Sequence, residues 1–250
     1  MTDIEKSAVT AHFDDYAAHW SERIRQHGYF SRYLVVKDML RRLGHPSTVL
    51  DVGCGTGDYC TLFDPNITNY VGIDISPAMV KRCSELYPGY DFRVGDGDRL
   101  DFPDGSVDLV LDVAVIEYYD NPLPHLRELA RVTRPGGSIV VIGPNGNNRT
   151  RGLARAIHRA VQRIKGRSEL PAKKRVRSHW RTLREISDLG AAAGLALAEH
   201  RFASIYLVPE IRPFVERFNV AISRQISGKP FWHWLTYWSA TNLVCRFVKT

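Results

Sequence analysis

Residues 49–57, with the sequence VLDVGCGTG, decide the fold of this chain. The apolar pattern predicts a buried strand that runs directly into three alternating glycines, Gly53, Gly55 and Gly57. Glycine lets the backbone turn sharply and approach a ligand closely, and a helix that starts after the loop presents free N–H groups. The stretch therefore predicts a strand, a ligand-binding glycine loop and a helix.

On both sides of this loop, short apolar runs alternate with helical patterns. The predicted strands are residues 48–52, 70–73, 91–94, 107–111, 138–142, 195–202 and 241–248. The predicted helices are residues 11–20, 31–43, 77–86, 123–132 and 183–194, with Ser31 as the cap of the second and His125 at the start or cap of the fourth. Strands that alternate with helices indicate an α/β domain with a doubly wound, mostly parallel sheet.

Acidic residues accompany three successive predicted strands. Asp51 lies in the first, Asp74 ends the second, and Asp96 follows the third, directly before Gly97. A carboxylate at the end of the second strand can accept both ribose hydroxyls of an adenosine group. Nicotinamide-dependent enzymes use a related glycine loop, but acids at two strand ends suit a cationic nucleoside without phosphates. This arrangement favours S-adenosylmethionine as the cofactor.

At this point the sequence resembles the class I S-adenosylmethionine-dependent methyltransferases. VLDVGCGTG resembles their first motif and VGIDIS their ribose-binding strand, while FPDGSVDLVLDVAVIEYYDNP and LRELARVTRPGGSIVVIGPN resemble the region that follows. These motifs cover residues 49–145. FDDYAAHW, residues 13–20, is similar to the opening element of the ubiquinone/menaquinone-biosynthesis-like small-molecule methyltransferases.

The resemblance implies a Rossmann-like, seven-stranded sheet with a C-terminal antiparallel hairpin, N-terminal helices and a helical cap. It also implies S-adenosylhomocysteine as the product and a set of cofactor-binding residues. Those residues are Tyr16, Trp20, Asp51, Gly53, Cys54, Gly55, Gly57, Asp74, Ile75, Met79, Asp96, Gly97, Asp112 and Val113. We interpret the chain as one domain: helices in residues 1–45, the cofactor core in 46–145, a basic helical cap in 146–194, and a hairpin with an inserted lid in 195–250.

Methyl transfer from a sulfonium depends chiefly on alignment of the reactants and exclusion of water. A hydroxyl acceptor also calls for a general base. We predict His179 for this role, because imidazole titrates near neutrality, with Glu117 and Tyr118 as further catalytic candidates. A surface histidine in a basic loop is the alternative for His179. The four cysteines show neither metal spacing nor a disulfide pattern, so we expect no metal site and a reduced, cytoplasmic location.

The net charge of +7 comes from one segment, since residues 149–184 hold thirteen Lys/Arg and one acid while the rest holds 21 bases and 26 acids. In a predicted helix, residues 152–165, arginines recur every four residues opposite an apolar stripe. Such a helix can lie on an anionic bilayer, which favours a lipophilic or lipid-linked acceptor, methylated through oxygen, and peripheral membrane contact through residues 151–165. No apolar run is long enough to span a membrane. The alternatives are a solvated lid helix, an RNA-directed methyltransferase that uses the basic segment, and a non-catalytic binding protein.

Overall fold

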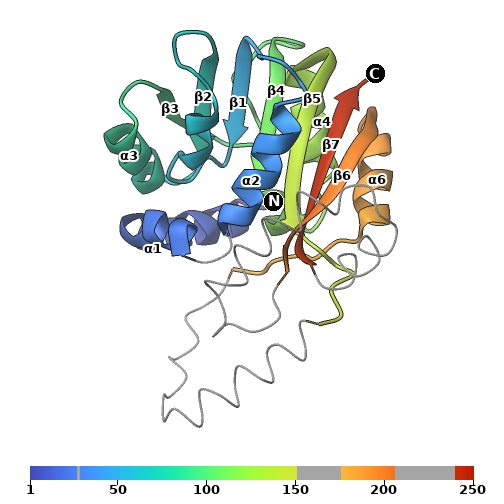
Figure 1. Ribbon diagram of the computed structural model, residues 1–250. Helices are drawn as coiled ribbons and strands as arrows, with labels where there is room; N and C mark the ends of the chain where they lie inside the picture. Colours follow the sequence, from blue (N-terminus) through green and yellow to red (C-terminus); the bar gives the residue numbers. More distant parts are fainter. Residues whose placement is uncertain (27–28, 151–175, 206–239) are drawn as a thin grey trace.

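The computed structural model describes residues 1–26, 29–150, 176–205 and 240–250, and a seven-stranded sheet forms its centre (Figure 1). The strands are β1 (Thr48–Val52), β2 (Asn69–Asp74), β3 (Asp91–Val94), β4 (Val107–Val113), β5 (Thr133–Pro144), β6 (Leu195–Ile205) and β7 (Ala240–Lys249), in the order β3-β2-β1-β4-β5-β7-β6. The first five pair in parallel, and β7 runs antiparallel to both β5 and β6. The predicted Rossmann-like sheet and its C-terminal hairpin are confirmed.

Helices cover both faces of the sheet. They are α1 (Asp3–Gln26), α2 (Tyr29–Leu40), α3 (Pro77–Leu86), α4 (Leu123–Val132) and α6 (Leu183–Ala192), with 3₁₀ turns η1 (Asp58–Leu62) and η2 (Ile116–Tyr118). Successive strand residues point to opposite faces, so Leu50 and Val52 pack with α4 in one core while Val49 packs with α2 in the other. Figure 1 shows α2 in front of the sheet, α4 behind it, and α1 across the end at which β1 and β2 finish.

Local sequence signals explain where two of these helices begin. Ser76 accepts a hydrogen bond from the Met79 amide at the start of α3, and Pro77 occupies the first turn, where its missing N–H costs nothing. At the start of α6, Thr182 and Glu185 bond reciprocally to each other's backbone amides. Both predicted helix starts are confirmed.

Some predicted elements differ from the structure. The first helix is longer than predicted, and α2 begins at Tyr29, so Ser31 lies inside it and the predicted cap is wrong. The glycine loop leads into the five-residue 3₁₀ turn η1 instead of a long α-helix, because Gly57 starts it in a left-handed conformation without a side-chain cap. The predicted basic helix at 152–165 and the lid inserted after β6 lie outside the described residues. Among those that are described, no helix has the length and apolarity needed to cross a membrane.

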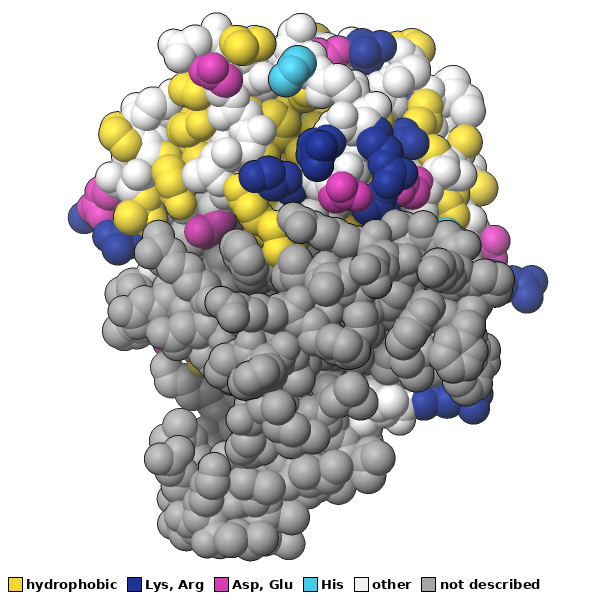
Figure 2. Space-filling view, in the orientation of Figure 1, with side chains coloured by type: hydrophobic (Ala, Val, Ile, Leu, Met, Phe, Trp, Pro, Cys, Tyr) yellow, Lys and Arg dark blue, Asp and Glu magenta, His cyan; other side chains and the backbone are white. Residues whose placement is uncertain are grey.

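Ion pairs fasten α2 to the edge of the sheet. The Arg201 guanidinium on β6 lies 2.6 Å from carboxylate oxygens of both Asp38 on α2 and Glu199 on β6. Arg42 also lies near both acids, at 3.6 Å and 3.5 Å respectively. Figure 2 shows basic and acidic side chains interspersed on the described part of this face. This part of the surface therefore does not present a field of one sign.

Candidate functional site

A cavity of about 650 Å³ lies at the carboxyl ends of β1, β2, β3 and β4. The strand order changes direction at β1. β2 and β3 lie on one side of it, and β4 and β5 lie on the other. Ligands of open α/β sheets bind at such a topological switch point. Of the predicted site residues, the lining includes Asp51, Gly53, Cys54, Gly55, Asp74, Ile75, Met79, Asp96, Gly97, Val113, Glu117 and Tyr118.

The glycine loop forms the floor of this cavity. The Gly53 and Cys54 amides both donate to the Ile73 carbonyl oxygen, at 2.7 Å and 3.0 Å, which pins the loop to β2. Gly53 has a φ of +68°, and a Cβ on it would lie 2.1 Å from Cγ2 of Val115. Only glycine fits there without strain or displacement of Val115. Gly57 supports the turn into η1 but does not line the cavity.

Asp74 closes the loop from the end of β2. One of its carboxylate oxygens accepts a hydrogen bond from the Gly55 amide and the other from the Ser76 amide, each at 2.9 Å. Burial raises the pKa of Asp74, and these two amide bonds oppose that rise. Each oxygen keeps a second lone pair, so the carboxylate remains able to accept hydroxyl groups from a ligand in the cavity.

Asp51 lies in β1, two residues before the first glycine of the loop. It is fully buried, and Oδ2 accepts a hydrogen bond from the Tyr70 hydroxyl at 2.6 Å. Oδ1 has no hydrogen-bond partner among the described residues, although Asp51 lines the cavity. Burial raises the pKa of Asp51 to about 7 against the opposing effect of the Tyr70 bond. An orphaned buried oxygen at a cavity wall is a built acceptor for a donor on a ligand.

Asp96 and Gly97 line the cavity at the end of β3, as predicted. Asp112 does not line it. Its Oδ2 lies 2.9 Å from Nε2 of His125 and its Oδ1 accepts from the Ile116 amide, so the carboxylate is fully buried beneath the site. Nδ1 of His125 lies 3.1 Å from the Gly97 carbonyl oxygen. His125 therefore links β4 to the loop after β3, and the cap of α4 is Pro122 and not the histidine.

Charge gives the cavity a preference among ligands. Five acids line its described part, namely Asp51, Asp58, Asp74, Asp96 and Glu117, against one basic side chain, Arg32. Carboxylates around a cavity attract cations and disfavour a pyrophosphate. S-adenosylmethionine is a nucleoside with a cationic sulfonium and no phosphate. Its charge and its hydrogen-bond donors fit the acceptors of this cavity.

Residues 50–141 match the family model described as "Methyltransferase domain". This part of the chain is similar to a methyltransferase domain. The fold as a whole is similar to that of magnesium protoporphyrin IX methyltransferase from Synechocystis, solved with bound SAH. That match has a TM-score of 0.65 and 16% sequence identity, and covers 98% of this chain and 100% of the other.

Curated methyltransferases are similar to part of this chain. A 2-methyl-6-phytyl-1,4-hydroquinone methyltransferase of Synechocystis is 42% identical over 99 residues, which cover 38% of this chain and 31% of that protein. A phthiotriol/phenolphthiotriol dimycocerosates methyltransferase of Mycobacterium tuberculosis is 38% identical over 93 residues, 36% of this chain and 34% of that protein. The chain thus matches about a third of the length of these two relatives.

Two predicted catalytic residues line the cavity. Glu117 and Tyr118 follow β4 in the turn η2. Burial raises the pKa of Glu117 to about 7, although Arg32 and a hydrogen bond from Ser178 lower it. Oγ of Ser178 lies 3.3 Å from Oε1 of Glu117. A carboxyl with a pKa close to neutrality is suited to move a proton at physiological pH.

Two other predicted site residues, His179 and Tyr16, do not line this cavity. The His179 ring borders a separate small pocket, with Nδ1 3.6 Å from Asp120, while its backbone amide donates to the Glu117 carbonyl oxygen at 2.7 Å. The Tyr16 ring packs against His12 at 4.8 Å between centroids and does not line the cavity. The Trp20 side chain lies outside the described part of the structure.

Sequence reasoning missed several residues in and around this cavity. Arg32 on α2 is buried and lines the cavity, although nothing distinguishes it from the other bases of the sequence. Trp180, Thr241 and Asn242 reach the cavity from segments far from the motifs. Lys6 lies on α1 and binds the acids after β3. Only the tertiary fold brings these residues near the cavity, so no local sequence pattern predicts them.

Proposed function

We propose that the chain transfers a methyl group from S-adenosylmethionine to a small lipophilic acceptor, with a hydroxyl oxygen as the methylated atom. The observation that carries the proposal is the combination, in one cavity, of acidic groups suited to this cofactor with a near-neutral carboxyl, Glu117, beside aromatic side chains. The methyltransferase domain supplies the reaction class, and the cavity supplies the argument for the acceptor.

The residues present fit the cofactor. The orphaned Oδ1 of Asp51 suits the α-ammonium group, Asp74 suits the ribose hydroxyls, and Asp96 suits the exocyclic amine of adenine. Gly53 leaves the floor free of a side chain, so that the backbone can approach the methionine portion. When bound, the cofactor supplies an electrophilic methyl group that a nucleophile displaces in line. The protein holds the two reactants in register and excludes water.

Aromatic residues support a lipophilic acceptor. Phe13, Tyr118 and Trp180 line the cavity, and the Phe13 and Tyr118 rings meet edge to face at 5.7 Å. Aromatic walls bind apolar rings and chains by burying their surface. The named relatives support the same class, because one acts on a phytyl hydroquinone and another on phthiotriol.

Glu117 is the group we assign as general base. It lines the cavity, its pKa is raised to about 7, and the Ser178 hydroxyl holds one of its oxygens. A carboxylate there can take the proton of an acceptor hydroxyl as its oxygen attacks. The role first predicted for His179 stays a prediction; through its backbone amide this residue holds the Glu117 carbonyl.

A transfer assay tests the proposal. Purified protein is incubated with methyl-labelled S-adenosylmethionine and each of three acceptors: a hydroquinone with a long alkyl tail, the same ring without the tail, and total RNA. We expect labelling of the tailed hydroquinone above that of the other two, and loss of labelling in Asp74→Ala because the ribose acceptor is removed. Preferential labelling of RNA, or undiminished labelling by Asp74→Ala, would contradict the proposal.

We assign membrane contact to the basic segment at residues 151–165, which lies outside the described residues. The arginine repeat of the sequence, together with a lipophilic acceptor, supports peripheral binding to an anionic bilayer. Co-sedimentation with liposomes tests this assignment. Stronger binding to anionic than to neutral vesicles, reduced by substitution of Arg155 and Arg159 with glutamine, is the expected result. Equal binding to both kinds of vesicle would contradict it.

A further inference from the structure

Lys6 joins the N-terminal helix to the adenine end of the cavity. Its ammonium nitrogen lies 2.6 Å from a carboxylate oxygen of Asp96 and 2.7 Å from one of Asp98. The Lys6 side chain is only 16% exposed. Burial lowers the pKa of Lys6, but the two carboxylates outweigh that effect and raise it, so the amine stays charged. One cation thus neutralises two acids, one of which lines the cavity.

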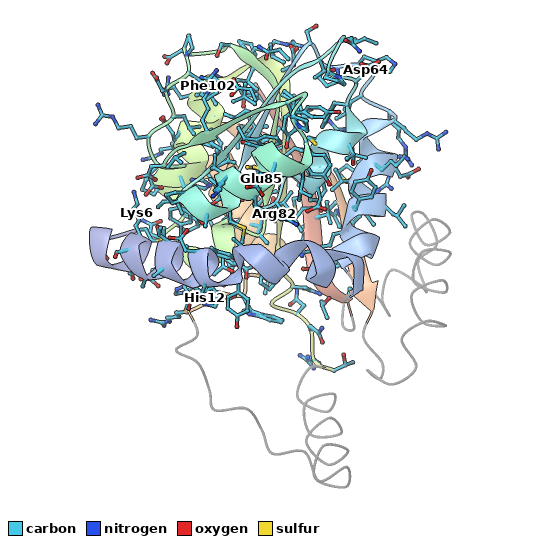
Figure 3. The ribbon with its side chains drawn as sticks, turned by 90° about the vertical axis from the view of Figure 1, so that its left-hand side faces the viewer. Lys6, His12, Asp64, Arg82, Glu85 and Phe102 are labelled. Atoms are coloured by element: carbon cyan, nitrogen blue, oxygen red, sulfur yellow. The ribbon has the colours of Figure 1, made fainter. Side chains whose placement is uncertain are left out.

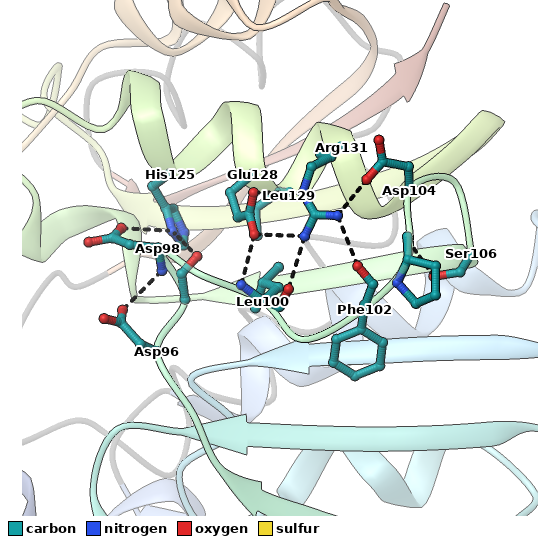
Figure 4. Close-up of polar contacts among 12 residues, drawn as sticks. Asp96, Asp98, Leu100, Phe102, Asp104, Ser106, His125, Glu128, Leu129 and Arg131 are labelled. Carbon is teal, nitrogen blue, oxygen red and sulfur yellow. Dashed lines mark hydrogen bonds and ion pairs between the residues drawn. The ribbon is translucent and has the colours of Figure 1, made fainter.

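The loop that carries these acids is fixed to α4 and does not depend on Lys6 for its shape. Figure 4 shows the contacts of this loop with α4. The Arg131 guanidinium donates to the Leu100 and Phe102 carbonyl oxygens, each at 2.9 Å. The Leu100 amide donates to Glu128 at 2.8 Å, and His125 meets the Gly97 carbonyl. Separation of Lys6 from the acids therefore moves α1 and leaves the loop in place.

A second polar contact holds α1 eight residues further along. The Ser76 hydroxyl at the start of α3 donates to Oδ1 of Asp14, and the Ala78 amide donates to the same oxygen at 3.3 Å. Figure 3 shows α1 lying along α3, with Lys6 towards its beginning. The two contacts adjoin Asp74 and Asp96, the acids that suit the ribose and the adenine. Between them, Val9 and Phe13 of α1 line the cavity.

We propose that Lys6 is a positioning residue that closes α1 over the nucleoside part of the cofactor and thereby sets how long the cofactor stays bound. The inference rests on the proposed use of this cavity by S-adenosylmethionine. Asp96 is the shared element, because its carboxylate binds Lys6 through Oδ2 and offers further lone pairs to the adenine amine. Closure of α1 and binding of adenine therefore reinforce each other, and release requires the Lys6 contacts to open.

The experiment measures the dissociation rate of S-adenosylhomocysteine, displaced by excess S-adenosylmethionine and followed by the fluorescence of the protein. We expect Lys6→Gln to release the product about 5–10-fold faster, because a partly buried ion pair shared by two carboxylates contributes more free energy than an exposed pair. Lys6→Arg, which keeps the charge and can contact both acids, should stay within about 2-fold of the wild type. Arg82→Gln is the matched control, because this cation pairs with Glu85 on the outer surface of α3, away from the cavity.

Salt and a second variant guard against a merely structural effect. Raising NaCl to about 0.5 M should speed release from the wild type more than from Lys6→Gln, because the wild type has the close Lys6 ion pairs to screen and the variant keeps the longer contact of the Met1 ammonium with Asp98, at 3.6 Å. Asp98→Asn, which weakens the same contact from the loop side at a residue that does not itself line the cavity, should also speed release. Equal dissociation rates in the wild type and both variants would overturn the inference alone. Failure of the wild type to bind the product at all would overturn the proposed function as well.

Discussion

Replacement of Asp51 by asparagine should stabilise the protein without ligand and weaken its binding of the cofactor. The change removes one negative charge, keeps the shape of the side chain, and keeps an oxygen for the Tyr70 hydroxyl. The ordinary pKa of this carboxyl is 3.8, and burial raises it to about 7 in the folded protein. A difference of about 3 units corresponds to about 4 kcal/mol that the ionised group costs the folded state above neutral pH.

The sign follows from proton binding. Because the folded state binds the Asp51 proton more tightly than the unfolded chain, the free energy of unfolding falls as the pH rises from about 4 to about 7. An asparagine side chain does not titrate, so Asp51→Asn escapes this loss. The stabilisation that it confers should be about 2–3 kcal/mol larger at about pH 8 than at about pH 5.

Urea denaturation of the ligand-free wild type and variant at the two pH values measures this difference. Asp101→Asn is the control, since this acid is exposed and should show no such pH-dependent gain. In the Asp51→Asn variant, cofactor affinity measured by calorimetry should fall about 10–100-fold, because a charge-assisted hydrogen bond to the ligand is lost. A stability gain that is equal at both pH values, or unchanged affinity, would refute the assignment of the orphaned oxygen.

Three further substitutions test other parts of the site. Glu117→Gln should lower the rate of methyl transfer at least about 100-fold and leave cofactor affinity unchanged. The rate of the wild type should rise with pH up to about 7, where the Glu117 carboxyl loses its proton. A variant with the full rate would exclude Glu117 as the general base. Gly53→Ala should lower the free energy of unfolding, measured by urea titration, by about 1–3 kcal/mol and block cofactor binding, because the added Cβ meets Val115. A second substitution, Val115→Ala, in the same chain should restore part of the lost stability. Burial lowers the pKa of His125, but hydrogen bonds to Asp112 and Asp98 outweigh burial and raise it to about 9. The charged imidazole therefore adds to the free energy of unfolding below about pH 6.5, and this contribution is lost as the pH rises to about 9. Thermal melting of His125→Asn should lack that decline; a parallel pH profile would contradict a charged His125.

The sequence predicted the sheet because its signals are local. Strands covered on both faces must be continuously apolar, and glycines after β1 mark a turn that other residues cannot make, as the positive φ of Gly53 shows. Asp74 and Asp96 follow strands that lie side by side, so their convergence on one cavity also follows from the chain order. These positions need no knowledge of tertiary packing beyond the order of the strands.

The rest of the site depends on contacts that no local pattern encodes. Asp112 lies near the end of β4, as predicted. Its carboxylate, however, contacts the His125 ring on α4 and does not line the cavity. Ala114 adopts a φ of +61° at the same strand end, a strain that a sequence pattern does not reveal. Arg32 reaches the cavity from α2, and Lys6 on α1 binds Asp96 at its edge. Their roles arise only when those helices pack across the sheet.

Transfer of a methyl group from S-adenosylmethionine to a lipophilic small molecule in this cavity can be tested in a mixture of natural acceptors. The purified protein is incubated with methyl-labelled S-adenosylmethionine and an extract of its own organism, and organic-soluble products are then separated from polymeric ones. We expect label in the organic phase, dependent on Glu117 and absent in Asp74→Ala. Label confined to RNase-sensitive polymer, or organic label that persists in Asp74→Ala, would contradict it.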